Sequence, residues 1–469
     1  MTGHRKRLVC LVAAIAAMAM LALPTVGAGA SVRRQGANQK CNLGALKKAS
    51  GVTEITFWHS MARANEEALV RLTDQFNSSQ SKVKVTLVNQ TSYVDTAEKY
   101  VAGLSTGDLP DLVQIEDTGL QQMIDTQSIL PVESCIKADK FKTDDFVKRV
   151  IDYYTVGGTQ WAMPFNVSNP VFYYNKLAFE KAGLDPDVAP KTLDEVKQFS
   201  EKLVASGVVH NAGFGLKTDP WYLEQWLAKA GKAYVNNGNG RKSRATKVAF
   251  DTKPGLEIFT WMKDMVDNNL AEVNNDEGSS NFDNLLGIGA DNHAMTIDSS
   301  ASLGTVTQVL NGGGYPNVKI GVAPIPGPVG KGGVLVGGAS LYISNKSDAA
   351  KQAAAWEYTK FLTEPETQAD WSASTGYVPI RKSSIDLPAI ADLWASQPEY
   401  RVAYDQLISG TNNVATAGPV IGDYKGARDE VRTAETSMFT QGVSPKAALK
   451  AARQKADAAI KEYNSRIGG

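Results

Sequence analysis

Strand-like segments alternate with amphipathic segments early in the chain, and this alternation constrains the fold more than any other feature. The strand-like segments are short and rich in β-branched residues: residues 53–57, 83–88 and 112–115. The spacing of apolar residues predicts helices at 93–104 and at 118–124, the second with Thr118 as its N-cap. Alternation with short connections predicts an α/β fold in which a parallel sheet carries helices on both faces.

The first thirty residues are predicted to be a secretory signal peptide. Residues 4–7 are basic, residues 8–23 are apolar, and residues 28–30 are small, as at a cleavage site. We therefore expect cleavage after Ala30 and a secreted or periplasmic protein. Residues 31–50 are polar and basic, and we expect them to form a flexible N-terminal segment. The remaining chain of about 440 residues is too long for one hydrophobic core, which predicts two lobes.

The net charge argues against nucleic-acid and membrane binding, and the cysteine content predicts a disulfide. The chain has 49 basic and 49 acidic residues, and three of the basic ones lie in the signal peptide, so the mature net charge is −3. This balance gives no electrostatic footprint for nucleic acid or for an anionic membrane. Cleavage removes Cys10 and leaves Cys41 and Cys135 in an oxidising compartment, where they are predicted to form a disulfide; two unrelated thiols are the alternative.

Catalytic signatures are scarce in this sequence. It has no Gly-x-Ser-x-Gly or His-Glu-x-x-His motif, and its histidines are too dispersed for a zinc site, so we expect neither a metal nor a cofactor. A secreted carbohydrate-active enzyme remains an alternative, with Asp117 and Asp298 as its carboxylate pair.

Polar and aromatic clusters lie instead at the ends of predicted elements. The first, residues 57–61 (FWHSM), follows the first strand, and open α/β sheets bind ligands beyond the carboxyl ends of their strands. Trp58 and His59 are therefore candidate ligand neighbours, with a packed Trp–His pair as the alternative. Carboxylates, amides and aromatic faces together suit a polyhydroxylated ligand.

Four motifs together resemble one family. They are residues 57–61 (FWHSM), 164–176 (PFNVSNPVFYYNK), 337–341 (GGASL) and 375–380 (TGYVPI). In this order they resemble the extracytoplasmic solute-binding proteins of ABC importers, in the family that includes maltose- and glycerol-3-phosphate-binding proteins. The resemblance implies a two-lobed periplasmic-binding-protein fold of type II, with a ligand cleft between hinged lobes and a membrane permease as partner. We expect a monomer without enzyme activity.

The resemblance also implies lobe boundaries. The first lobe is expected at 51–166 and 299–346, and the second at 167–298 and 347–469. The chain would then cross the hinge near 163–170, 297–303 and 344–350.

Residue by residue, the resemblance implies a ligand site. Its members are Tyr93, Glu116, Asp117, Ser168, Ser300, Gly338 and Tyr377, with Trp221 or Trp226 stacking on a sugar ring. Gly338 would admit the ligand to the backbone because it lacks a side chain. Core packing is the alternative for Tyr93 and the tryptophans, and helix capping is the alternative for Ser300.

One position departs from the family pattern. Phosphate-binding members carry an arginine in a late glycine-containing loop, and Val420 takes its place here, while Arg428 lies about two turns further on. A buried phosphate without its arginine would leave charge unpaired. We therefore expect a neutral sugar, oligosaccharide or polyol, with glycerol 3-phosphate or a glycerophosphodiester as the alternative.

Overall fold

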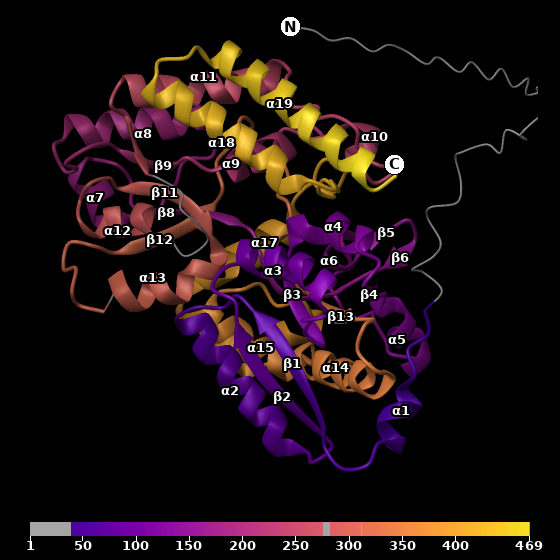
Figure 1. Cartoon of the computed structure of the whole chain (residues 1–469). Helices are drawn as coiled ribbons and strands as arrows, with labels where there is room; N and C mark the ends of the chain where they lie inside the picture. The colour runs from indigo at the N-terminus through magenta and orange to yellow at the C-terminus, as the bar shows by residue number, and fades with distance from the viewer. Residues whose placement is uncertain (1–38, 275–281, 311, 469) are drawn as a thin grey trace, which may run out of the picture.

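The computed structural model describes residues 39–274, 282–310 and 312–468. The chain forms two lobes, each built around its own sheet, one above the other in Figure 1. This is the expected α/β, two-lobed architecture. The predicted signal peptide and its cleavage site lie outside the described residues.

The sheet of the first lobe has the strand order β2-β1-β3-β13-β4, with β7 also pairing with β13. Its strands are β1 (Thr53–His59), β2 (Val83–Asn89), β3 (Leu112–Glu116), β4 (Ile129–Leu130), β7 (Met163–Ser168) and β13 (Gly337–Ser344). The three strands predicted from the alternation are confirmed, and β1 lies parallel to both β2 and β3. Strand β13 runs antiparallel to β3, so this sheet is mixed and not fully parallel.

Helices cover both faces of this sheet. They include α2 (Ala64–Ser79), α3 (Tyr93–Thr106), α4 (Leu120–Asp125), α5 (Val132–Asp139), α6 (Lys148–Tyr153), α14 (Ala349–Leu362) and α15 (Pro365–Thr375). The prediction that Thr118 caps a helix is wrong. Its hydroxyl donates to Glu116 Oε2 at 2.7 Å, and a single 3₁₀ turn, Asp117–Gly119, separates β3 from α4.

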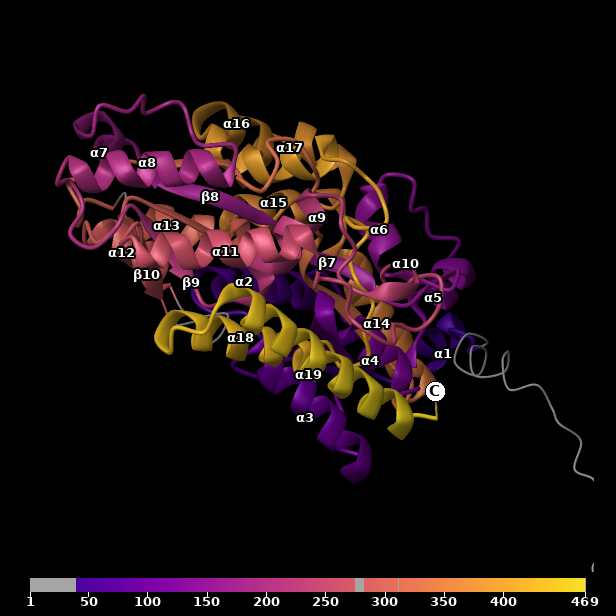
Figure 2. The ribbon, with the colours of Figure 1, turned by 90° about the horizontal axis from the view of Figure 1, so that it is seen from above.

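The sheet of the second lobe has the order β10-β9-β11-β8-β12. Its strands are β8 (Pro170–Asn175), β9 (Phe214–Lys217), β10 (Ala271–Asn274), β11 (Met295–Ser299) and β12 (Ile320–Pro324). Its helices include α7 (Lys176–Lys181), α8 (Leu193–Ala205), α9 (Pro220–Lys229), α10 (Asn236–Asn239), α11 (Lys253–Asp267), α12 (Asp283–Gly289), α13 (Leu303–Leu310), α17 (Val402–Ser409), α18 (Tyr424–Thr440) and α19 (Pro445–Arg466). Helix α16 (Pro388–Ser396) packs on α15 of the first lobe. Figure 2 shows α18 and α19 running side by side, close to α11, at the C-terminal end of the chain.

The chain crosses between the lobes at places that differ from two of the three expected ones. The first crossing, at Asn169 between β7 and β8, lies where it was expected. The second lies in the segment 325–336 between β12 and β13, and the third lies between α15 and α17. The expected boundaries at 299–346 and 347–469 are therefore corrected. Strand β12 pairs with β8 in the second lobe, and α14 and α15 pack on β1 and α2 in the first.

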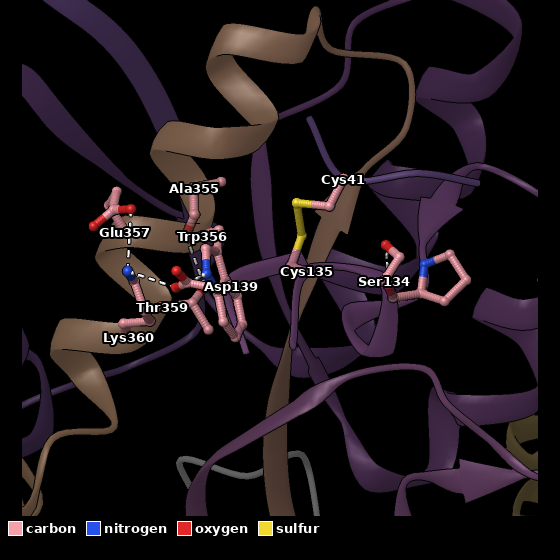
Figure 3. The surroundings of a disulfide bond; sticks show 10 residues. Cys41, Ser134, Cys135, Asp139, Ala355, Trp356, Glu357, Thr359 and Lys360 are labelled. Atoms are coloured by element: carbon pink, nitrogen blue, oxygen red, sulfur yellow. Dashed lines mark hydrogen bonds and ion pairs between the residues drawn. A yellow bond between two sulfur atoms is a disulfide. The ribbon is translucent and has the colours of Figure 1, made fainter. Parts of the chain in front are cut away.

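The N-terminal segment is ordered where the structure describes it, contrary to the expected flexibility of residues 31–50. Helix α1 (Leu43–Lys48) packs on α14 and α5, and its Leu46 is buried. The predicted disulfide joins Cys41 to Cys135 of α5 (Figure 3). Beside it, Asp139 accepts a hydrogen bond from Trp356 Nε1 and pairs with Lys360 of α14, both at 2.8 Å. The disulfide thus ties the start of the described chain to the first lobe.

In the part of the chain that the structure describes, no helix is both long enough and apolar enough to span a membrane. The two short strands β5 (Thr155–Val156) and β6 (Thr159–Gln160) form a separate hairpin between α6 and β7.

Candidate functional site

A chain of hydrogen bonds joins residues from five of the motifs and segments singled out in the sequence. The backbone N–H of Ser60 donates to Gln114 Oε1 at 2.9 Å, and Gln114 Nε2 donates to Asn166 Oδ1 at 2.8 Å. Asn166 Nδ2 then donates to the Tyr93 hydroxyl at 2.8 Å, and this hydroxyl lies 3.2 Å from that of Tyr377. The ends of β1 and β7, the start of α3 and the segment after α15 therefore meet at one place.

The two tyrosines at the end of this chain are held firmly. The ring of Tyr377 stacks on Trp371, with centroids 5.4 Å apart and planes 15° apart. Its carbonyl accepts from Ser372 Oγ, and its N–H donates to Thr375 Oγ1. Burial raises the pKa of both Tyr93 and Tyr377, and the nearby Glu116 carboxylate raises both further. Both hydroxyls therefore remain protonated and can donate hydrogen bonds.

A charged cluster adjoins the tyrosines through Glu116. Glu116 Oε2 lies 3.6 Å from Nη1 of Arg428, which belongs to α18 of the second lobe. Arg428 binds Glu224 of α9 through two hydrogen bonds, of 2.8 and 2.7 Å. Asp117, next to Glu116, accepts from the hydroxyl of Tyr153 at 3.0 Å. One carboxylate from each lobe thus pairs with the guanidinium, and Asp117 is close enough for the charge of Arg428 to oppose the rise in pKa that burial causes.

The pKa shifts in this cluster follow from burial and mutual charge. Burial, and then the adjacent Glu116, raise the pKa of Asp117 well above its usual value, and Arg428 only partly opposes this. Burial disfavours the charge of Arg428, but Glu224 and Glu116 outweigh it and raise the arginine pKa well above its usual value. Arg428 is therefore fixed as a cation, while burial and the neighbouring charge favour the protonated form of Asp117.

This arrangement predicts a pH-dependent effect of Asp117→Asn on stability. Because the pKa of Asp117 in the folded protein lies above its ordinary value of 3.8, its contribution to folding is complete below pH 3.8 and is lost as the pH rises through the raised pKa. The asparagine keeps an acceptor for Tyr153 without the charge. We expect the variant to unfold at a higher temperature than the parent at pH 7, with the difference shrinking toward pH 4. A difference that grows on acidification would contradict the assignment.

The sequence shows only that Arg428 lies about two turns after Val420, the position of the missing arginine, and it assigns Arg428 no role in the site. The structure places its guanidinium in the charged cluster, whereas the side chain of Val420 is buried. Glu224 was missed because its partner lies 204 residues away along the chain. Gln114 could have been singled out from the sequence, because it is a polar residue among the apolar residues of a predicted buried strand.

Gly338 and Ser168 lie together where β13 pairs with β7. Gly338 has a φ of +92°, and a Cβ there would lie 2.0 Å from the backbone oxygen of Asn166. The structure thus adds a reason for this glycine beside the expected one, which was access of a ligand to its backbone. Close approach of two strands requires it, whether or not a ligand does.

Ser300 lies at the first crossing, and its N–H donates to Asn169 O at 2.9 Å. Ser299, and not Ser300, caps the short 3₁₀ helix that follows, because Ser299 Oγ accepts a hydrogen bond from Ala301 N. The Ser300 hydroxyl is buried and has no hydrogen-bond partner among the described residues. A buried hydroxyl of this kind is costly unless something else binds it.

The aromatic candidates divide into packed and accessible side chains. Trp58 is buried beneath Lys99, whose Nζ lies 4.5 Å from the centre of its ring. His59 is only 1% exposed, its Nδ1 accepts from Met61 N, and burial lowers its pKa. The geometry thus favours packing roles for both. Trp226 is also buried and donates to Pro326 O, which leaves the half-buried Trp221 as the stacking candidate.

The alternative carboxylate pair does not form a shared site through hydrogen bonds. Asp298 accepts from Ser299 N and Ser302 Oγ with one oxygen and from Asn284 Nδ2 with the other, and it lies 3.6 Å from Lys217 Nζ. All of these partners belong to the second lobe, whereas Asp117 bonds to Tyr153 of the first. No group of three or more metal-ligating side chains occurs within residues 39–274, 282–310 and 312–468.

Comparison with known proteins identifies the family. The family model described as bacterial extracellular solute-binding protein matches residues 71–401, well over half of the chain. This chain belongs to that family. The sn-glycerol-3-phosphate-binding periplasmic protein UgpB of Pectobacterium atrosepticum is 28% identical over 428 residues, covering 88% of this chain and 93% of that protein. UgpB of Shigella flexneri is 28% identical over 434 residues, covering 90% of this chain and 95% of that protein.

Solved structures show the same fold. UgpB from Mycobacterium tuberculosis in complex with glycerophosphocholine gives a TM-score of 0.74 at 23% identity, covering 88% of this chain and 99% of that one. The GacH receptor of Streptomyces glaucescens, solved unliganded and with acarbose, gives a TM-score of 0.73 at 18% identity, with the same coverage. The expected two-lobed binding-protein architecture is therefore confirmed, and this solute-binding protein shares it with proteins solved in complex with glycerophosphocholine and with acarbose.

Proposed function

We propose that this solute-binding protein captures a neutral carbohydrate or polyol between its lobes and delivers it to the permease of an ABC importer. The pairing of Arg428 supports the proposal. Its guanidinium is bound by Glu224 and faces Glu116, so a phosphate at this place would meet more carboxylates than cations. Sugar hydroxyls, in contrast, donate to carboxylates and accept from tyrosines without needing a counter-charge.

The proposed contacts follow the predicted site. Hydroxyls of the ligand would form hydrogen bonds with the carboxylates and hydroxyls of Tyr93, Glu116, Asp117, Ser168, Ser300 and Tyr377. One ring face of the ligand would stack on the half-buried indole of Trp221, and the backbone of Gly338 would stay accessible to the ligand. Hydrogen bonds to a buried, fixed set of donors and acceptors give such a site its specificity. Glu116 of the first lobe and Arg428 of the second already lie 3.6 Å apart, so we propose that the solute binds beside this ion pair and that the lobes hinge around both.

A glycerophosphodiester is the second candidate, and Arg241 favours it. Its guanidinium donates to the backbone oxygen of Gly418 at 2.7 Å, in the loop where the family arginine is missing. It also donates to the backbone oxygen of Tyr153 at 3.1 Å. Its Nη2 is buried without a hydrogen-bond partner among the described residues. A phosphodiester carries one negative charge, which a single arginine can balance.

A thermal-shift screen separates these candidates from each other and from an enzyme. The mature protein is heated with sugars, polyols, glycerol 3-phosphate and glycerophosphodiesters, because a ligand that binds only the folded state raises the unfolding temperature. We expect the largest shift from a neutral carbohydrate, without turnover on prolonged incubation. Glycerol 3-phosphate as the best ligand would contradict the proposal, and release of product would favour the enzyme.

We further propose that the protein acts as a monomer, is exported by its signal peptide with cleavage near Ala30, and works outside the cytoplasmic membrane without a cofactor. Its curated relatives are named periplasmic binding proteins, which supports this location.

A further inference from the structure

We propose that Glu224 determines the charge of the solute that this protein accepts, by occupying the guanidinium of Arg428. The inference rests on the proposed function only for the place where the solute binds. Glu224 itself need not touch the solute. It is a positioning residue that acts through Arg428.

The pair is built into one lobe. Glu224 lies on α9 and Arg428 on α18, and these helices pack on each other in the second lobe. Nε of Arg428 donates to Oε1 of Glu224 at 2.8 Å, and Nη2 donates to Oε2 at 2.7 Å, so each carboxylate oxygen accepts one hydrogen bond. The pairing therefore needs no contact from the first lobe, and we expect it to persist when the lobes open.

Burial makes the pair selective. The Glu224 side chain is 1% exposed and that of Arg428 is 17% exposed, so the arginine keeps a face open while its partner is enclosed. Nη1 of Arg428, which Glu224 does not bind, lies 3.6 Å from Oε2 of Glu116. Burial and then the charge of that carboxylate raise the pKa of both tyrosines of the site. Arginine binds carboxylate and phosphate with the same forked geometry, so a carboxylate already in the fork excludes a phosphate from it.

The ring of Tyr424 restricts the guanidinium further. It lies one turn before Arg428 on α18, with its centre 5.1 Å from the guanidinium carbon. An arginine held between an aromatic ring and a buried carboxylate cannot swing toward an anionic solute without leaving Glu224 unpaired. Leaving a buried carboxylate unpaired is strongly unfavourable.

The test is a charge-selective gain of binding in Glu224→Gln. Glutamine keeps the shape and one acceptor for Arg428 but removes the negative charge. Calorimetric titrations of the full mature protein use glycerol 3-phosphate as the charged probe and glycerol as its uncharged counterpart. We expect the variant to bind glycerol 3-phosphate roughly 10- to 100-fold more tightly than the parent does. The reason is that the guanidinium of Arg428, no longer paired with a carboxylate, can donate charged hydrogen bonds to the phosphate. The affinity for glycerol should stay unchanged.

Two further variants make the result decisive. Glu224→Asp retains the charge and should bind glycerol 3-phosphate like the parent. Glu224→Gln combined with Arg428→Gln should lose the gain, because the released guanidinium is gone. Equal phosphate binding by parent and Glu224→Gln, or a gain that survives the loss of Arg428, would overturn the inference.

The outcome is separable from that of the proposed function. If no neutral carbohydrate binds the parent, the proposed function fails, but the comparison of the two proteins toward glycerol 3-phosphate still decides the role of Glu224. Circular dichroism of each variant excludes a general loss of structure, which would lower binding of both probes and could not produce a selective gain.

Discussion

Replacing both Cys41 and Cys135 by serine is expected to lower the free energy of unfolding by about 4–5 kcal/mol. The disulfide joins residues 94 apart in the sequence, and closing a loop of that length removes much conformational freedom from the unfolded chain. Without it, α1 keeps its packing on α14 and α5 but loses its covalent link to the first lobe. Chemical denaturation of the parent and of the double variant measures the difference.

The control for this prediction is Ser134→Ala, which changes the neighbour of Cys135 without touching the cross-link. Ser134 donates only to Pro131 O within its own helical turn, so we expect its loss to cost about 1 kcal/mol or less. The parent under strong reductant should behave like the double-serine variant. A double variant as stable as the parent would show that the disulfide does not constrain the unfolded chain.

The first lobe was largely predictable because its signals are local. Strand β1 and the helix after it are encoded by residue type and spacing within a few positions. The order of the motifs then placed the polar residues at the carboxyl ends of β1, β3 and β7, and these three strand ends lie on the same side of the sheet. Burial of Gln114 and Asn166 on that side allows the hydrogen-bond chain to form.

The inter-lobe features could not be predicted in the same way. Strand β12 looks like any other short apolar strand, and only pairing with β8 assigns it to the second lobe. The same holds for α14, whose buried residues, Trp356 among them, do not reveal which sheet they cover. The pairing of Arg428 with Glu224 joins helices far apart in the chain, and no spacing rule reports such a contact.

We propose that the solute binds beside the Tyr93–Tyr377 pair, and Tyr377→Ala tests this binding site most directly. The substitution removes a hydroxyl 3.2 Å from Tyr93 and a ring stacked on Trp371. We expect the affinity for the best solute of the parent to fall by roughly 100-fold, the product of one lost hydrogen bond and one lost ring contact. Tyr377→Phe, which keeps the ring, should lose about tenfold.

Tyr358→Phe is the matched control. That tyrosine is also buried in the first lobe and bonds to Thr73 at 2.6 Å, but it packs against Phe57 and Phe76, away from the tyrosine pair. Calorimetric titration of the four proteins with the same solute is the deciding measurement. We expect a large loss of affinity for Tyr377→Ala, a smaller loss for Tyr377→Phe and none for Tyr358→Phe. Full affinity in Tyr377→Ala would contradict the proposed binding site.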